Sequence, residues 1–139
     1  MTLTDEGKVN LLRQLLGNTY AGIEIRLAKS LAPVAEHLLT FATIAECDFG
    51  GYAPIVPTGW PDPTLNIAGE AESDDTTLLW TASGVTGSQD VWGLYITFLG
   101  HGYTQYVLAA HRFASPVTIA ADGETVAKNL NAYLANLVP

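Results

Sequence analysis

The sequence predicts a mainly β fold, a single antiparallel β-sandwich or jelly-roll-like domain with an N-terminal α-helix. From residue 22 onward, short apolar or alternating runs recur every ~8–12 residues between turn-forming residues, which is typical of sandwiches and barrels. A chain of 139 residues also suits one hydrophobic core. We therefore expect a single domain 1–139 with a helix in 1–18, a β-rich body in 22–125 and a last element in 126–139.

The N-terminal segment has the apolar spacing of a helix. Thr4 is a suitable N-cap, and Gly17-Asn18 is a suitable end. A helix this short is marginal alone, so its apolar stripe should dock on another surface. The stripe consists of Leu11, Leu12, Leu15 and Leu16.

The β-rich body begins with a period of two, in which apolar residues alternate with polar ones over 23–28. Segment 31–48 is expected to be a loop with one short helical turn and then a strand. Segment 52–63 contains four prolines in ten residues, so we expect an extended edge segment in place of a central strand. Its anchors are Tyr52, Ile55, Val56 and Trp60.

The second half predicts strands separated by turns. Residues 76–81 are rich in β-favouring side chains. Residues 91–98 are apolar on both faces, which favours a central strand, and 106–113 is its expected antiparallel partner. Ser115-Pro116 is expected to interrupt that strand, with a short strand following at 117–120.

The C-terminal segment allows two interpretations. Its apolar residues fit a helical stripe, whereas the Asp122-Gly123 turn favours a hairpin into a last strand. Both remain open at this point. The apolar residues concerned are Val126, Leu130, Tyr133, Leu134 and Leu137.

Charge is scarce and acidic. Charged residues make up 14% of the chain, against ~25% in typical domains, and the net charge is −8. The six basic residues are scattered, so neither nucleic acid nor an anionic membrane is an expected partner. No run of ~18 apolar residues and no secretory signal occurs, so we expect a soluble protein made in a reducing cytoplasm. So few charges favour association with other subunits.

The residues able to carry chemistry do not form a recognisable site. His37, His101 and His111 lack ligand-type neighbours at metal-site spacing. Cys47 lies between two carboxylates that would raise its pKa, which favours a structural cysteine. We predict a non-enzymatic protein without a metal or cofactor. The densest acidic run is interpreted as a solvated hairpin between strands, although calcium binding and glycoside hydrolysis are alternatives. It contains Glu70, Glu72, Asp74 and Asp75.

Aromatic residues offer a further alternative, a platform for stacking sugars. Most of them fall within expected strands, so core or subunit contact is favoured over sugar binding. The tryptophans are Trp60, Trp80 and Trp92.

Several motifs together resemble a group of small tailed-bacteriophage virion proteins. They span nearly the whole chain and are structural in character. The matching segments are Leu3-Thr4-Asp5-Glu6-Gly7-Lys8, Asp48-Phe49-Gly50-Gly51-Tyr52-Ala53-Pro54-Ile55, Val91-Trp92-Gly93-Leu94-Tyr95 and His111-Arg112-Phe113-Ala114-Ser115-Pro116-Val117-Thr118-Ile119.

The resemblance implies a β-domain of the virion, made in the host cytoplasm. We expect a capsid decoration (cement) protein that stabilises the lattice of a major capsid protein or contacts a neighbouring virion protein. Self-association as a trimer at three-fold positions is the accompanying hypothesis. The leucine stripe and segment 52–63 are the expected contacts. The alternative is a tail, baseplate or fibre-tip module that binds host-surface glycans through exposed tryptophans.

Overall fold

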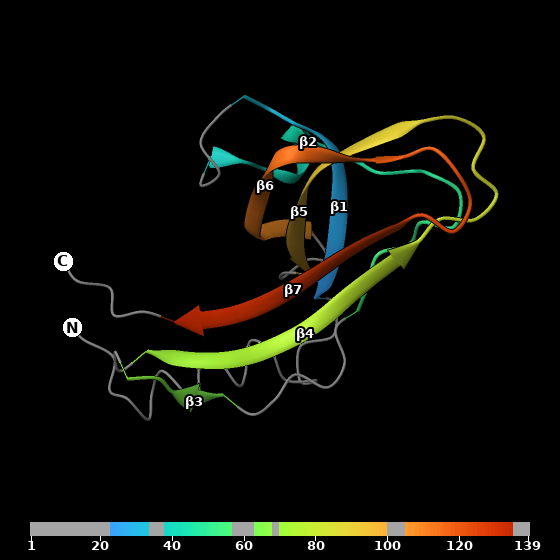
Figure 1. Ribbon diagram of the computed structural model, residues 1–139. Coiled ribbons are helices and arrows are strands. Elements are labelled where there is room, and N and C mark those ends of the chain that lie inside the picture. Colours follow the sequence, from blue (N-terminus) through green and yellow to red (C-terminus); the bar gives the residue numbers. More distant parts are fainter. Residues whose placement is uncertain (1–22, 34–37, 57–62, 68–69, 100–104, 135–139) are drawn as a thin grey trace. The chain divides into compact units, whose positions relative to one another are not determined.

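The computed structural model describes residues 23–33, 38–56, 63–67, 70–99 and 105–134 (Figure 1). Over these residues the protein is mainly β and antiparallel, which confirms the predicted class. The predicted helix 1–18 lies outside the described residues. So do four predicted contact residues of that helix and one of the extended segment, namely Leu11, Leu12, Leu15, Leu16 and Trp60.

The strands form two sheets. The four-stranded sheet has the order β2-β1-β5-β6, and the three-stranded sheet has the order β3-β4-β7. Contacts divide the chain into two compact units, one of residues 22–56 and 79–127 and the other of 1–21, 57–78 and 128–139. That the whole chain is a single domain stays a prediction. The strands are β1 (Glu24–Leu31), β2 (Ile44–Glu46), β3 (Thr64–Leu65), β4 (Ala71–Thr81), β5 (Gln89–Leu99), β6 (Gln105–Ile119) and β7 (Thr125–Leu134).

Strand β1 shows how the alternating sequence is used. Ile25 and Leu27 are fully buried, whereas Glu24 and Arg26 between them are half-buried. The pairing with β2 shifts register between Ala28 and Ser30, which is a bulge-like irregularity. Beyond this shift Leu31 is buried as well. Both faces of the sheet therefore carry apolar side chains at this end of β1.

Strand β5 is central, between β1 and β6, and β6 is its antiparallel partner, as predicted. The expected interruption at Ser115-Pro116 is wrong, because β6 is one strand of 15 residues. Val91 pairs with Val117 but Gly93 pairs with Arg112, so four residues of β6 lie opposite Trp92 alone, three more than regular pairing allows. Proline is tolerated there because β6 is an edge strand in the four-stranded sheet, and the extra residues bend it (Figure 1).

The segment after β1 follows its prediction. A single 3-10 turn, η2 (Phe41–Thr43), precedes strand β2. Thr40 and Thr43 close this turn reciprocally: the Thr40 N–H donates to Oγ1 of Thr43, and the Thr43 N–H donates to the Thr40 carbonyl, each at 2.9 Å. These two threonines therefore fix the turn that ends the loop, and strand β2 begins directly after it.

The last element is a strand. Strand β7 begins two residues after Gly123, which has a φ of +85°. The turn is attached to the end of β4, because the Gly123 N–H donates to the Ala82 carbonyl at 2.8 Å and the Ala82 N–H donates to the Glu124 carbonyl at 2.9 Å. The helical interpretation of 126–139 is therefore wrong as far as residue 134, because pairing with β4 takes up the backbone groups.

The unit of residues 22–56 and 79–127 has apolar side chains on both faces of its sheet. On one face, Ala28 and Tyr95 pack with Leu31 and Leu39. The alternation of β1 and β5 places Ile25, Leu27 and Leu94 on the other face. Further buried side chains of this unit are Cys47, Phe49, Trp80, Ala82, Val91, Phe113, Ile119 and Val126.

Candidate functional site

A charged network lies on the Tyr95 face of the four-stranded sheet. The Arg26 guanidinium forms ion pairs with Glu24 on its own strand and with Glu46 on β2. The ring of Phe41 lies 5.9 Å from the Arg26 guanidinium carbon, within the range of a cation–π contact. Burial alone would lower the pKa of Arg26, but hydrogen bonds and charges from Glu24 and Glu46 raise it. The arginine is therefore held as a permanent cation between two strands.

Two tyrosines extend this network. The Tyr52 hydroxyl donates to Oε1 of Glu46 at 2.8 Å and accepts from the Leu27 N–H at 3.0 Å. Burial is the main cause that raises the pKa of Tyr52, and the hydrogen bond to Glu46 adds to it. Burial also raises the pKa of Tyr95 to about 12. Both phenols therefore stay protonated at neutral pH. The protonated Tyr52 hydroxyl can donate its hydrogen bond to Glu46, which links this segment to β2.

The described part of the extended segment, residues 52–56, meets the edge of β1 at one bridge, between Ile55 and Ile25. Ile55 exchanges two backbone hydrogen bonds with Ile25, at 2.8 and 2.9 Å, and the Trp80 indole N–H donates to the Ala53 carbonyl at 3.0 Å. Tyr52 and Ile55 are half-buried, so they hold the segment in place. Of the predicted contact residues that are described, Val56 is the one that is mainly exposed, at 60%.

Exposed apolar side chains surround the buried cluster of Leu31, Leu39 and Tyr95. Leu38 and Phe41 flank Leu39 in the chain, and both are exposed. Trp92 is 41% exposed and lines a shallow hollow of about 150 Å³ together with Ser30, Leu31 and Arg112. Leu31 belongs both to the lining of this hollow and to the buried cluster. We call Leu38, Phe41 and Trp92 the apolar surface.

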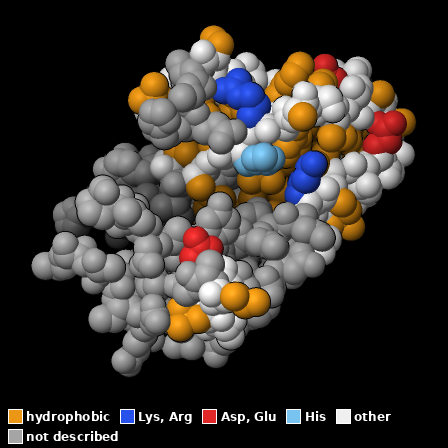
Figure 2. Space-filling view, turned by 60° about the vertical axis from the view of Figure 1, so that its left-hand side comes forward, with side chains coloured by type: hydrophobic (Ala, Val, Ile, Leu, Met, Phe, Trp, Pro, Cys, Tyr) orange, Lys and Arg blue, Asp and Glu red, His pale blue; other side chains and the backbone are white. Residues whose placement is uncertain are grey.

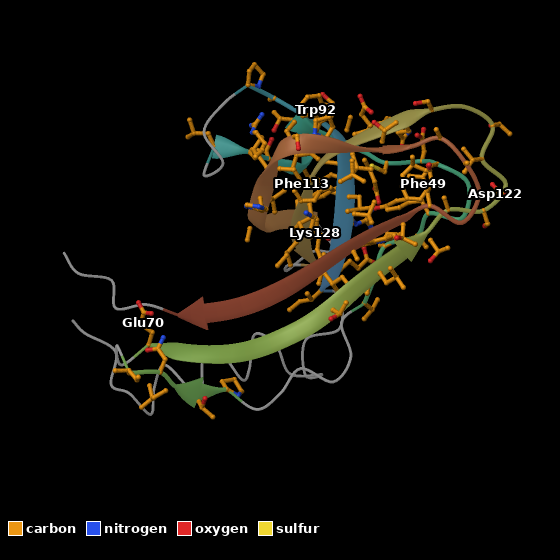
Figure 3. All side chains as sticks on the ribbon, viewed as in Figure 1. Phe49, Glu70, Trp92, Phe113, Asp122 and Lys128 are labelled. Carbon is orange, nitrogen blue, oxygen red and sulfur yellow. The ribbon has the colours of Figure 1, made fainter. Side chains whose placement is uncertain are left out.

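Figures 2 and 3 show the setting of this surface. In Figure 2, hydrophobic side chains are visible over the upper half of the described surface, interspersed with Lys or Arg, Asp or Glu and His side chains. In Figure 3, the labelled Trp92 lies in the part of the picture that holds the four-stranded sheet, and it belongs to β5. Sequence reasoning assigned Trp92 to core or subunit contact within a central strand. It lies where the β5–β6 register shifts, opposite residues 113–116, and no local pattern signals this shift.

The other chemically able residues are dispersed. His111 is exposed on β6, as its alternation suggested, with its ring 6.0 Å from that of Phe113. His37 and His101 lie outside the described residues. Cys47 is buried, and this burial, more than its neighbours, raises the pKa of its thiol to about 12. Over the described ranges, no three metal-ligating side chains gather, and no helix is long and apolar enough to cross a membrane.

The acidic run is placed differently from its prediction. Glu70 precedes β4, and the remaining acids of the run are part of that strand, so the expected position between strands is wrong. The strand forms because β4 pairs with β3 at Thr64–Glu72 and Leu65–Ala71 and also borders β7. Tertiary pairing thus overrides the low β propensity of acidic residues.

We found no protein-family model, curated protein or solved structure with significant similarity to this chain. Function is therefore inferred from the surface and its chemistry.

Proposed function

We propose that this chain is a non-enzymatic structural protein of a tailed-bacteriophage particle, a decoration protein that binds and stabilises the capsid lattice. The apolar surface carries this proposal, because three large apolar side chains lie exposed in the unit where the Arg26 ion pairs join β1 to β2. Rigid apolar side chains are typical anchors of protein interfaces. The motif resemblance described above supplies the phage setting, and sandwich packing of the sheets belongs to the same proposal.

Self-association is the role that we assign to the apolar surface. A charged share of 14% leaves little polar surface to keep subunits apart. Burying a half-exposed tryptophan and two further apolar side chains would contribute several kcal/mol at roughly 25 cal/mol per Å². The proposed assembly is a trimer that sits on the shell formed by the major capsid protein.

The test combines sedimentation with capsid binding. Wild-type protein is expected to sediment as a trimer and to co-sediment with expanded capsids of the major capsid protein from the same genome. Trp92→Asp should shift the protein to monomers, because an unpaired charge would be buried in the contact. Thr86→Asp, at an exposed turn, is the control and should remain trimeric. A monomeric wild-type protein that does not bind capsids would remove the proposal.

A fibre-tip module that binds host glycans is the second candidate, and the hollow at Trp92 is the observation that favours it. An exposed indole beside the Ser30 hydroxyl and the Arg112 guanidinium offers a stacking plane with polar donors. Glycan binding that is lost in Trp92→Phe, with the oligomer intact by sedimentation, would favour this function. Trp60→Ala tests the tryptophan that the sequence alone suggested.

A further inference from the structure

The hairpin between β3 and β4 presents an apolar side chain at its tip. Thr64 and Leu65 pair with Glu72 and Ala71, and residues 66–70 connect the two strands. Ile67 in this connection has a relative exposure of 108%, so almost none of its surface is covered, and Leu65 is 43% exposed. The largest apolar side chain of this connection is thus fully open to solvent.

A hydrogen-bonded clamp closes the base of this turn. The Asn66 N–H donates to the Glu70 carbonyl at 2.9 Å, and the Glu70 N–H donates back to Oδ1 of Asn66 at 3.0 Å. The Asn66 side-chain amide also donates to Oε2 of Glu70 at 3.2 Å. A single exposed isoleucine is ordinary on a protein surface. One held on a clamped turn is preorganised for binding, because less conformational entropy is lost on contact.

The chain around this hairpin is acidic. Four carboxylate residues occur within positions 70–75, and no lysine or arginine occurs anywhere from Ser30 to His111. A contact made by this hairpin therefore brings negative charge to its rim. Electrostatic complementarity favours a protein partner with basic residues there and disfavours the negatively charged surface of a membrane.

We infer that the β3–β4 hairpin is a docking knob, in which Ile67 enters an apolar pocket of a protein partner rimmed by lysine or arginine. This inference rests on the proposed function, under which the partner is the capsid shell. It separates two contacts: the apolar surface joins copies of the chain, and the knob attaches the assembly to the shell.

Binding of full-length protein to expanded capsids of the major capsid protein tests the knob. Ile67→Asp should weaken binding at least roughly tenfold, as expected for losing a buried isoleucine, whereas Ile67→Val should retain most of it. Leu79→Asp is the matched control, because Leu79 is also exposed and belongs to neither proposed contact, and it should bind as wild type does. All variants should sediment as the wild-type oligomer. Wild-type binding should also weaken as sodium chloride is raised, because charge attraction is screened.

The outcomes separate the knob from the proposed function. If wild type and Ile67→Asp bind capsids equally, the knob is wrong and the decoration function stands. If wild type does not bind capsids, the decoration function fails and the knob fails with it. Binding to zwitterionic lipid vesicles that is lost in Ile67→Asp would replace the protein pocket by a membrane and would also overturn the inference.

Discussion

The Tyr52 hydroxyl donates a hydrogen bond of 2.8 Å to Oε1 of Glu46, at the edge of the four-stranded sheet. The same hydroxyl accepts the backbone N–H of Leu27 at 3.0 Å. Since Glu46 is also the ion-pair partner of Arg26, one side chain connects β1, β2 and the segment that follows β2. Glu46 therefore joins three segments at this edge of the sheet.

Tyr52→Phe should destabilise the protein by about 1–3 kcal/mol, because it leaves the Leu27 N–H and a Glu46 oxygen without their partner. Urea unfolding followed by circular dichroism measures this loss. Thr86→Val removes a hydroxyl at an exposed turn and should change the unfolding free energy by less than about 0.5 kcal/mol. Equal stability of Tyr52→Phe and wild type would mean that water replaces the hydroxyl.

Trp80→Phe should lower the unfolding free energy by about 1–3 kcal/mol, since it removes the donor to the Ala53 carbonyl and some buried volume. Trp92→Phe is the matched control, because Trp92 is partly exposed and should lose less. Denaturant titrations of the two variants give the comparison. A larger loss for Trp92→Phe would contradict the assigned burial of Trp80.

Gly93→Ala should destabilise the sheet by about 1–3 kcal/mol or more, because a Cβ there would lie 2.5 Å from the His111 carbonyl oxygen and 2.8 Å from Cδ1 of Leu31. The backbone contact cannot be relieved by a rotamer change. Gly84→Ala provides the comparison: it has open space but a φ of +69°, so its cost should be about 1 kcal/mol. Thermal unfolding measures both variants. A lower melting temperature for Gly84→Ala than for Gly93→Ala would contradict the steric clash at Gly93.

The free energy of unfolding should decrease at acid pH, because two carboxylates in the turn before β7 become protonated. Oε2 of Glu124 accepts the N–H groups of Ala120 and Ala121, and these bonds lower its pKa in the folded state. The pKa of Asp122 is lowered in the same way by the N–H groups of Val85 and Gly84. Because the folded pKa values lie below the unfolded ones, the stabilisation is complete above the unfolded values and disappears as pH falls through the folded ones.

Glu124→Gln tests this dependence, because it keeps an acceptor oxygen but removes the titrating charge. At pH 7 this variant should be less stable than wild type. The difference should shrink below about pH 4.5, the ordinary glutamate value, and continue to shrink at lower pH. Urea unfolding across this range gives both curves. Parallel curves down to the lowest pH would exclude the assigned role of the carboxylate.

Much of the fold could be predicted from local patterns. The alternation of Ile25 and Leu27 with polar residues placed β1, and the two-sided apolar run of 91–98 indicated the central strand. Pro116 led to a wrong prediction of a strand break. The free-energy cost of a proline in a strand depends on whether that strand is central or at an edge, which is a property of the sheet. The C-terminal stripe was ambiguous because its residues fit a helical period, whereas pairing with β4 decided for a strand.

The candidate sites were less predictable. Arg26 meets Glu46, twenty residues away, only through the β1–β2 pairing, and Trp92 lies at a register shift between β5 and β6 that the sequence does not signal. Ile67 carries no local sign of its exposure.

By itself the sequence determined the β class, most strand positions, the acidic charge and the scarcity of charged residues, because composition and side-chain period are local properties. Only the tertiary structure decided strand order, register, the Arg26 network and which apolar side chains stay exposed. Those features depend on contacts between residues distant in the chain, for which a period of two gives the face of a strand but not its neighbour.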